Sequence, residues 1–309
     1  MSSRRRSGFT MITVLWVITV SSIVALAGAL AGRTNVSAAR NRVQAERALW
    51  SALGCARTTQ AEIDDLLGNA PTLDQGALIW RTLDRRIVSR PVTPTWPCIV
   101  RFEAAGTKLD VNAATPEMIA LLLRTLGEPD GRVLEMTDAL IDWRDTNDVE
   151  LPSGAERAWY ERNTRALPRN GPLADVRELA LVRGFEDLSR FAPVLWTEPG
   201  RVSLAHASAE VLSAVPGITR ETADLIASLA AEGRAVSDVS VVAGRVSSQS
   251  ASELMSRYPD IVRATTADPD AWMLEVSASN GEPATTVVLQ WRLVRAGRRV
   301  TVARSRTSL

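Results

Sequence analysis

The chain begins with a long run of apolar and small residues. Between Gly8 and Gly32 it carries no charged residue. At about 1.5 Å per helical residue the run spans about 37 Å, enough to cross the ~30 Å hydrocarbon core of a membrane with some tilt. The pattern alone leaves open a removable secretory signal, with ALAGALAG at residues 25–32 as its cleavage region, a plain anchor, or a more specialised segment.

An amphipathic pattern continues this run without a break. Apolar residues recur at steps of three and four residues, or multiples of them, until the breakers Gly68-Asn69-Ala70-Pro71 end the pattern. The sequence therefore predicts one long helix, with its first part in lipid and its second part against a sheet. The predicted apolar stripe consists of Val36, Ala39, Val43, Leu49, Leu53 and Ala56.

The remaining pattern separates strands from helices. Residues 78–103 are rich in Ile, Val, Trp and Phe with prolines between them, which predicts strands. Helical patterns dominate from residue 109 to about residue 257. From Trp272 onward the period becomes two, with hairpin signals at Asn280-Gly281 and Ala296-Gly297. We expect the two strand regions to form one antiparallel sheet on the N-terminal helix, with the helical region as an insertion.

The helical region contains an internal repeat. DVNAATPEMI at residues 110–119 aligns with SLAHASAEVL at residues 203–212. Each copy has a hydroxyl residue, Thr115 or Ser208, followed two residues later by Glu, a combination that suits the start of a helix. Between these copies, Asp175 is expected to cap a further helix that ends at a glycine.

The second copy continues into AVPGITRETADLIASL, which is typical of a helix-hairpin-helix unit. Pro216-Gly217-Ile218 forms the expected hairpin, and a second helix is expected to begin near Thr219 or Arg220. Such units can offer backbone amides to DNA phosphates. The chain has a single lysine, Lys108, so the pattern favours a packing role over contact with DNA.

The composition of the chain argues against several classes of protein and of metal site. The net charge is +1, so the chain lacks the strong basic field of a dedicated nucleic-acid binder. With two cysteines and the single histidine His206, a disulfide-dense scaffold, a four-cysteine zinc site and a multi-histidine metal site are excluded. The sequence offers no nucleophile–base pair and no phosphate-binding loop, so we expect no enzymatic activity.

The two cysteines fall on different predicted elements. Cys55 lies on the long helix and Cys98 on an early strand. A disulfide between them remains open, but the sequence favours two small buried thiols.

An acidic stretch, LIDWRDTNDVELPSGAERAWY at residues 140–160, is the most chemically suggestive segment. Asp145, Asn147 and the Val149 carbonyl alternate like the first ligands of an EF-hand loop. Glu150 stands where such a loop needs glycine, which breaks the pattern. Glu156 nevertheless occupies the twelfth place, where a glutamate supplies two oxygens, and hard oxygen ligands suit Ca²⁺ better than zinc or copper.

The alternative for this stretch is a solvated acidic loop. In that case Asp142 and Asp145 pair with nearby arginines, and spacing alone does not decide between the two interpretations. The candidate arginine partners are Arg144, Arg157 and Arg162.

The N-terminal motif carries a family resemblance. A basic leader, Arg4–Arg6, ends in Gly8, and Phe9-Thr10-Met11-Ile12 opens the apolar helix. This resembles the type III signal of type IV prepilins and pseudopilins, which implies cleavage after Gly8 by a prepilin peptidase and methylation of Phe9. Most of these proteins carry Glu at the fifth mature position, where this chain has Thr13.

The loss of that Glu is typical of the K-type minor pseudopilin of type II secretion systems. The spine helix, the hairpin repeat, the acidic block and the terminal strands resemble the same family in the same order. The resemblance implies an α+β pilin-like fold: a long N-terminal transmembrane helix plus an antiparallel sheet, with a large inserted all-α domain containing helix-hairpin-helix-like repeats. The implied divisions are a leader at 1–8, a transmembrane helix at 9–32, pilin-like residues 33–108, an inserted domain at 109–258 and C-terminal strands at 259–309.

The resemblance also implies a function. The chain is expected to nucleate and cap the tip of a type II secretion pseudopilus for export of folded proteins. It is expected to be a single-pass inner-membrane protein, with most of the chain in the periplasm. The implied partners are I- and J-type minor pseudopilins, then the H-type and major G-type subunits, prepilin peptidase and the inner-membrane assembly platform. The alternative is a DNA-contacting pilin-like competence protein, although nucleic acid is not an expected partner.

The same resemblance raises the expectation of a structural Ca²⁺ in the acidic stretch. It implies one set of candidate ligands: Asp142, Asp145, Asn147, Asp148 and Glu156.

Overall fold

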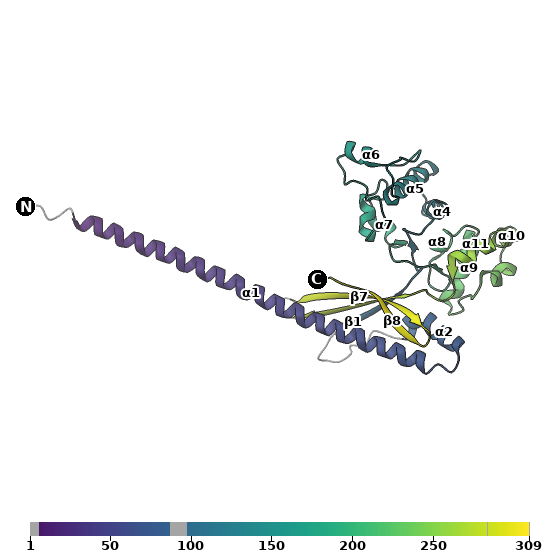
Figure 1. Cartoon of the computed structure of the whole chain (residues 1–309), viewed down its shortest axis with the longest axis horizontal. Coiled ribbons are helices and arrows are strands. Elements are labelled where there is room, and N and C mark those ends of the chain that lie inside the picture. Colours follow the sequence, from purple (N-terminus) through teal and green to yellow (C-terminus); the bar gives the residue numbers. More distant parts are fainter. Residues whose placement is uncertain (1–5, 87–97, 283, 309) are drawn as a thin grey trace, which may run out of the picture.

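A single helix, α1 (Arg6–Gly68), forms the spine of the molecule. The computed structural model describes residues 6–86, 98–282 and 284–308. In Figure 1 the first half of α1 extends alone, and the folded part of the chain gathers around its second half. The helix is long and apolar enough near its N-terminus to cross a membrane. The prediction of one continuous helix is confirmed, and Gly8 and Phe9 lie within it.

The sheet covers less of this helix than the sequence predicts. Ala48, Ala52 and Ala56 are fully buried, whereas Val36 and Val43 remain 52% and 50% exposed. The prediction that these two valines face the sheet is therefore wrong. The apolar periodicity of α1 continues beyond the part that the sheet covers. The sequence pattern therefore cannot show where along the helix the sheet ends.

Four antiparallel strands form the sheet, in the order β1-β6-β7-β8. Its turns contain Gly281 and Gly297, each with a positive φ that glycine adopts without strain. The predicted hairpins, the antiparallel sheet and its packing on α1 are confirmed. The strands are β1 (Cys98–Ala104), β6 (Trp272–Asn280), β7 (Thr285–Ala296) and β8 (Arg299–Ser308).

The segment before β1 is helical where strands were predicted. Residues 73–86 form two short helices, α2 (Leu73–Arg81) and α3 (Leu83–Arg86), while residues 87–97 lie outside the described residues. The Thr72 hydroxyl accepts a hydrogen bond from the Gln75 N–H and caps α2. Trp80 is buried and donates to the Pro269 carbonyl, 2.7 Å away. This distant contact overrides the strand-like composition.

A disulfide joins Cys55 on α1 to Cys98 at the start of β1. The expectation of two buried thiols is therefore wrong. Both residues are buried, as expected, but the packing of α1 on the sheet brings their Cα atoms to 6.7 Å, within bridging range. The bond fastens the spine helix to the edge strand of the sheet.

The inserted region between β1 and β6 has its own hydrophobic core, separate from the core between α1 and the sheet. In Figure 1 its helices lie beside the end of the sheet that is farther from the N-terminus. Each of its two halves is closed by a short parallel ladder, so the region is not purely helical: β2 (Leu109–Asp110) pairs with β3 (Leu195–Trp196), and β4 (Val202–Ser203) with β5 (Thr265–Thr266). Its helices are α4 (Pro116–Thr125), α5 (Asp130–Arg144), α6 (Arg157–Arg162), α7 (Leu188–Phe191), α8 (Ala209–Leu212), α9 (Arg220–Ala231), α10 (Ser248–Ser256) and α11 (Tyr258–Ala264), with 3₁₀ helices η1 (Val176–Leu181) and η2 (Val239–Arg245).

The internal repeat extends further than the sequence indicates. Thr115 and Ser208 cap α4 and α8 as predicted. Asp175 and Asp238 then cap η1 and η2 in the same manner, so the helix predicted after Asp175 is a 3₁₀ helix. Each half also closes with one of the parallel ladders. In the second half, Gly217 has a φ of 94° in the turn that leads to α9; the helix-hairpin-helix assignment stays a prediction.

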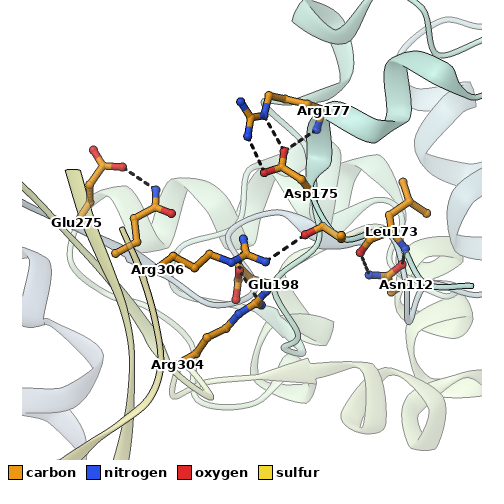
Figure 2. Close-up of polar contacts among 10 residues, drawn as sticks. Asn112, Leu173, Asp175, Arg177, Glu198, Glu275, Arg304 and Arg306 are labelled. Carbon is orange, nitrogen blue, oxygen red and sulfur yellow. Dashed lines mark hydrogen bonds and ion pairs between the residues drawn. The ribbon is translucent and has the colours of Figure 1, made fainter. Parts of the chain in front are cut away.

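Ion pairs fasten the inserted region to the sheet. Glu198 is 8% exposed and lies between Arg304 and Arg306 of β8, with N–O distances of 3.3 and 3.6 Å (Figure 2). Arg306 also donates to the Ala174 carbonyl. Since a buried carboxylate needs its cationic partners, these contacts fix where the region sits on the sheet.

We predict that the double variant C55S/C98S destabilises the folded part of the chain. The disulfide closes a sequence separation of 43 residues, and a loop of this size stabilises a fold by about 2–4 kcal/mol. The measurement is the melting temperature of the detergent-solubilised chain, with and without reductant. The wild-type protein should lose stability on reduction and the variant should not. Equal melting temperatures for oxidised and reduced wild type would contradict the role of this bond.

Candidate metal centre

The acidic loop, residues 145–156, connects α5 to α6 and folds back onto the end of α5. Asp142, in the last turn of α5, is fully buried. Its carboxylate accepts hydrogen bonds from the Leu151 N–H, at 3.2 Å, and from the Ala155 N–H, at 2.9 Å. A side chain on a regular helix thus holds the returning part of the loop.

A glycine permits this close return. A Cβ atom at Gly154 would lie 1.9 Å from Oδ2 of Asp142, which is closer than any stable contact. The loop therefore reaches the buried carboxylate only because residue 154 has no side chain.

Three carboxylates meet where the loop closes. Oxygen atoms of Asp142, Asp145 and Glu156 lie within 4.8 Å of one another. Glu156 is 3% exposed, and one of its oxygens accepts a hydrogen bond from the Arg157 N–H at the start of α6. Its other oxygen, Oε1, is buried and has no hydrogen-bond partner among the described residues. Such an atom is costly to bury without a partner.

Burial and mutual repulsion disfavour the ionised forms of these acids. Burial raises the pKa of Asp142 to about 6, and the neighbouring charges of Asp145 and Asp138 act in the same direction. Burial also raises the pKa of Glu156, with further contributions from nearby acids. Holding several negative charges together costs free energy unless protons or a cation offset them. The donor set of hard oxygens fits a Ca²⁺-like ion.

The arginines do not supply the offsetting charge that the alternative interpretation requires. Arg144 donates to the backbone carbonyls of Val111 and Ala114. Arg157 pairs with Glu161. Among the residues that the structure describes, no ion pair links Asp142 or Asp145 to the three candidate arginines.

The other two predicted ligands have different contacts. The Asn147 side chain accepts from the Val149 N–H at 2.8 Å, inside the loop. Asp148 accepts from Nδ2 of Asn170 at 2.8 Å. The structure therefore brings three of the five predicted residues together and places Asn147 and Asp148 beside them.

Asn170 is a residue of this site that the sequence analysis missed. Besides binding Asp148, its side chain donates to the Asn147 carbonyl at 3.2 Å. Its φ of 52° is typical of a turn, and the Asn170-Gly171 dipeptide was the available signal. Two hydrogen bonds between the Asn112 side chain and the Leu173 backbone then hold this second segment in place (Figure 2).

A second polar group merits comparison with a hydrolase site. Oγ of Ser203 lies 3.0 Å from Nδ1 of His206, and Nε2 of His206 lies 3.8 Å from Asp84. Ser203 is fully buried, so its hydroxyl is closed to a substrate. The histidine ring packs edge-on against Trp272. These contacts join α3, the sheet and the inserted region, and they have a structural role.

Comparison with known proteins gives consistent results. The family described as "Type II secretion system (T2SS), protein K" matches residues 101–195. A curated relative, "Type II secretion system protein K" of Klebsiella pneumoniae, is 26% identical over 194 residues. The match covers 60% of this chain and 60% of that relative, so the chain aligns with less than two thirds of its length.

A solved structure agrees in fold. The crystal structure of the GspK-GspI-GspJ complex from the enterotoxigenic Escherichia coli type 2 secretion system matches 87% of this chain and 99% of the matched chain. The TM-score is 0.56 at 16% sequence identity. At this identity the match supports the fold, a pilin-like α+β architecture with an insertion.

We predict that Asp142 makes the metal-free folded chain more stable at acidic pH than at neutral pH. Because its folded pKa is raised to about 6, the stability it contributes is fully present below about pH 4 and is lost as the pH rises through 6. The difference is on the order of 2 kcal/mol. The measurement is the melting temperature of wild type and D142N in chelator at several pH values, with E150Q as an exposed control in the same loop.

In this series D142N should lack the loss of stability between pH 4 and 7 that wild type and E150Q share. Parallel pH profiles for wild type and D142N would contradict the assignment.

Proposed function

We propose that the chain is a protein K of the type II secretion family, a minor pseudopilin, and that it occupies and caps the tip of the pseudopilus filament. The observation that carries this proposal is the insertion between β1 and β6, which has its own core. It lies beside the end of the sheet that is farther from the membrane helix (Figure 1). A second subunit stacked above this one would meet that bulk, whereas α1 remains exposed for subunits below.

The partners follow from the same proposal. The matched Escherichia coli structure contains GspK together with GspI and GspJ, which supports I- and J-type minor pseudopilins as the first partners of this chain. H-type and major G-type subunits would follow further down the filament. The family is structural and has no enzymatic role, in agreement with the expectation from composition.

The N-terminal motif supports the route of assembly. Prepilin peptidase would cut after Gly8 and leave Phe9 as a methylated N-terminus, and the assembly platform of the inner membrane would extract the subunit. Most of the chain would then be periplasmic. Most related subunits carry a carboxylate at the position of Thr13. The uncharged threonine avoids the free-energy cost of burying that charge in the bilayer. A tip subunit has no subunit ahead of it that would need this charge.

DNA contact is not proposed. Arg220, at the start of α9, pairs with Asp224 and Glu210, so the nearest cation of the hairpin is already engaged.

We further propose that the acidic loop holds a structural Ca²⁺ through Asp142, Asp145 and Glu156. The unpartnered oxygen of Glu156 and the close return of the loop at Gly154 support this assignment. Asn147 and Asp148 lie in the same loop and remain candidate ligands. The ion would supply positive charge that offsets the repulsion among the acids. The chain's own part is to hold α5, the loop and α6 together around it.

We predict that T13E does not change the number of copies in the complex with I- and J-type partners. In this account the inserted region, and not residue 13, prevents stacking. The measurement is the subunit ratio of the purified membrane complex by quantitative mass spectrometry, with T19E, another substitution in the same span, as the matched control. More than one copy of the T13E subunit per complex would contradict the steric basis of capping.

We predict that calcium raises the melting temperature of the chain. An ion at about 100 times its dissociation constant stabilises the native state by about 2.7 kcal/mol, which corresponds to roughly 5–10 °C for a chain of this size. D145N should lose this response because it removes a ligand. G154A should lose it because a Cβ displaces Asp142, although every acid is retained.

The matched control for this series is E150Q, which alters an exposed acid of the same loop and should respond as wild type does. Unchanged melting of wild type on addition of EDTA, with no calcium in elemental analysis, would refute the site.

A further inference from the structure

An open cavity of about 610 Å³ lies where the two halves of the inserted region meet. Its walls are the start of α4 from the first half, α11 from the second half, and the connecting segment 199–202. Much of the lining is apolar: Leu109, Met118, Pro199, Val202, Pro216 and Ala264. Both the size and this lining are typical of a site for a small organic group.

The charges around the cavity do not balance. Its lining holds three arginines and four acids. Each arginine is already paired: Arg201 with Asp270, Arg257 with Glu117 and Asp260, and Arg263 with Asp260. The fourth acid, Asp110, forms no ion pair among the described residues. The lining therefore carries one negative charge without a partner, and that charge belongs to Asp110.

Asp110 is 5% exposed, and only part of its carboxylate is bonded. Oδ1 accepts a hydrogen bond from the Asn112 N–H at 2.9 Å, whereas Oδ2 has no hydrogen-bond partner within the described part of the chain. Burial raises the pKa of Asp110, and the opposing charge of Arg144 does not reverse this, since that guanidinium donates to the Val111 and Ala114 carbonyls. A buried carboxylate with an unused oxygen is costly unless a ligand supplies a donor.

The internal repeat shows that the fold does not require this charge. Asp110 aligns with Ser203, and each ends the first strand of its parallel ladder. Ser203 is fully buried as well, and its hydroxyl lies 3.0 Å from Nδ1 of His206. An uncharged side chain thus serves the same position in the second half. The carboxylate of Asp110 therefore calls for an explanation other than folding.

The chemistry of the cavity selects the kind of cation. Ca²⁺ takes about six to eight oxygen ligands, and a single free carboxylate oxygen in an apolar cavity does not supply them. An ammonium group needs far fewer acceptors, and its carbon stem can lie along apolar side chains. The N-terminus of α4, which favours an anion, already has the Thr115 cap and Glu117 in its first turn.

We propose that this cavity binds a primary ammonium group on an apolar stem, with Asp110 as the counter-ion and the apolar lining as the seat of the stem. The inference goes beyond the proposed function, because it depends neither on the position at the tip nor on the acidic loop.

The test measures binding of n-butylammonium to the detergent-solubilised full chain by titration calorimetry. 1-Butanol and butyrate are the matched ligands, with the same stem and a neutral or negative head. Butylammonium should bind about tenfold or more tightly than either, since hydrogen bonds to charged groups are the strong ones. Equal affinity for the three, or tighter binding of butyrate, would overturn the proposal.

Two variants locate the site. D110N keeps an oxygen for the Asn112 N–H and removes the charge, and A264L keeps Asp110 but fills the space for the stem. Each should lose about tenfold or more in affinity for butylammonium. E253Q, which alters an exposed acid of α10 outside the cavity, is the matched control and should bind as wild type does. Melting temperatures report whether each variant folds, and wild-type affinity in both folded variants would contradict the site.

A last comparison identifies the source of the ammonium group. N-acetyl-lysine amide carries the same head and stem as a protein side chain, whereas butylammonium represents a free amine. Tighter binding of the lysine derivative supports a lysine of another protein as the natural ligand. Tighter binding of butylammonium supports a small free amine. Failure of both to bind wild type would overturn the proposal and would leave the capping role unaffected.

Discussion

The packing of the second half of α1 on the four-stranded sheet is the contact on which the other features depend. Alanines at the interface let the helix lie close to the strands, and buried tryptophans such as Trp272 and Trp291 fill the space beside it. The disulfide from Cys55 to Cys98 fastens the same two layers. Because the turn at Gly281 reaches α1 at Gln44, where the sheet ends, the preceding helix is left uncovered. In the proposed function, that uncovered length would lie in the bilayer and against other subunits.

The insertion adds bulk without disturbing this contact. It leaves the sheet after β1, returns at β6, and forms a core of its own from two related halves. Ion pairs such as Glu198 with Arg304 and Arg306 fix it to the open face of the sheet. The acidic loop occurs only in the first half, between α5 and α6. In the proposed function, assembly and capping would therefore be carried by separate parts of one chain, the spine and the insertion.

Local signals explain what the sequence could predict. Asn280-Gly281 sets a hairpin, and Thr115 caps a helix, because each acts through its immediate neighbours. The helical state of α2 depends on Trp80 reaching the Pro269 carbonyl, 189 residues away, so composition misled the prediction.

The candidate metal centre could likewise be predicted only in part. Spacing identified Asp145 and Glu156, but the burial of Asp142 and the contact of Asn170 arise from segments that meet only in the folded chain. The disulfide between Cys55 and Cys98 likewise could not be predicted without knowing how closely α1 packs on the sheet. Residues that act across layers cannot be paired from a single sequence.

The central claim is the position at the tip, and the most direct measurement is the location of this subunit on isolated filaments. A gold label on the exposed α6 of the insertion, viewed by electron microscopy, reports that position. The account predicts one label at a single end of each pseudopilus. Labels distributed along the filament length would contradict it.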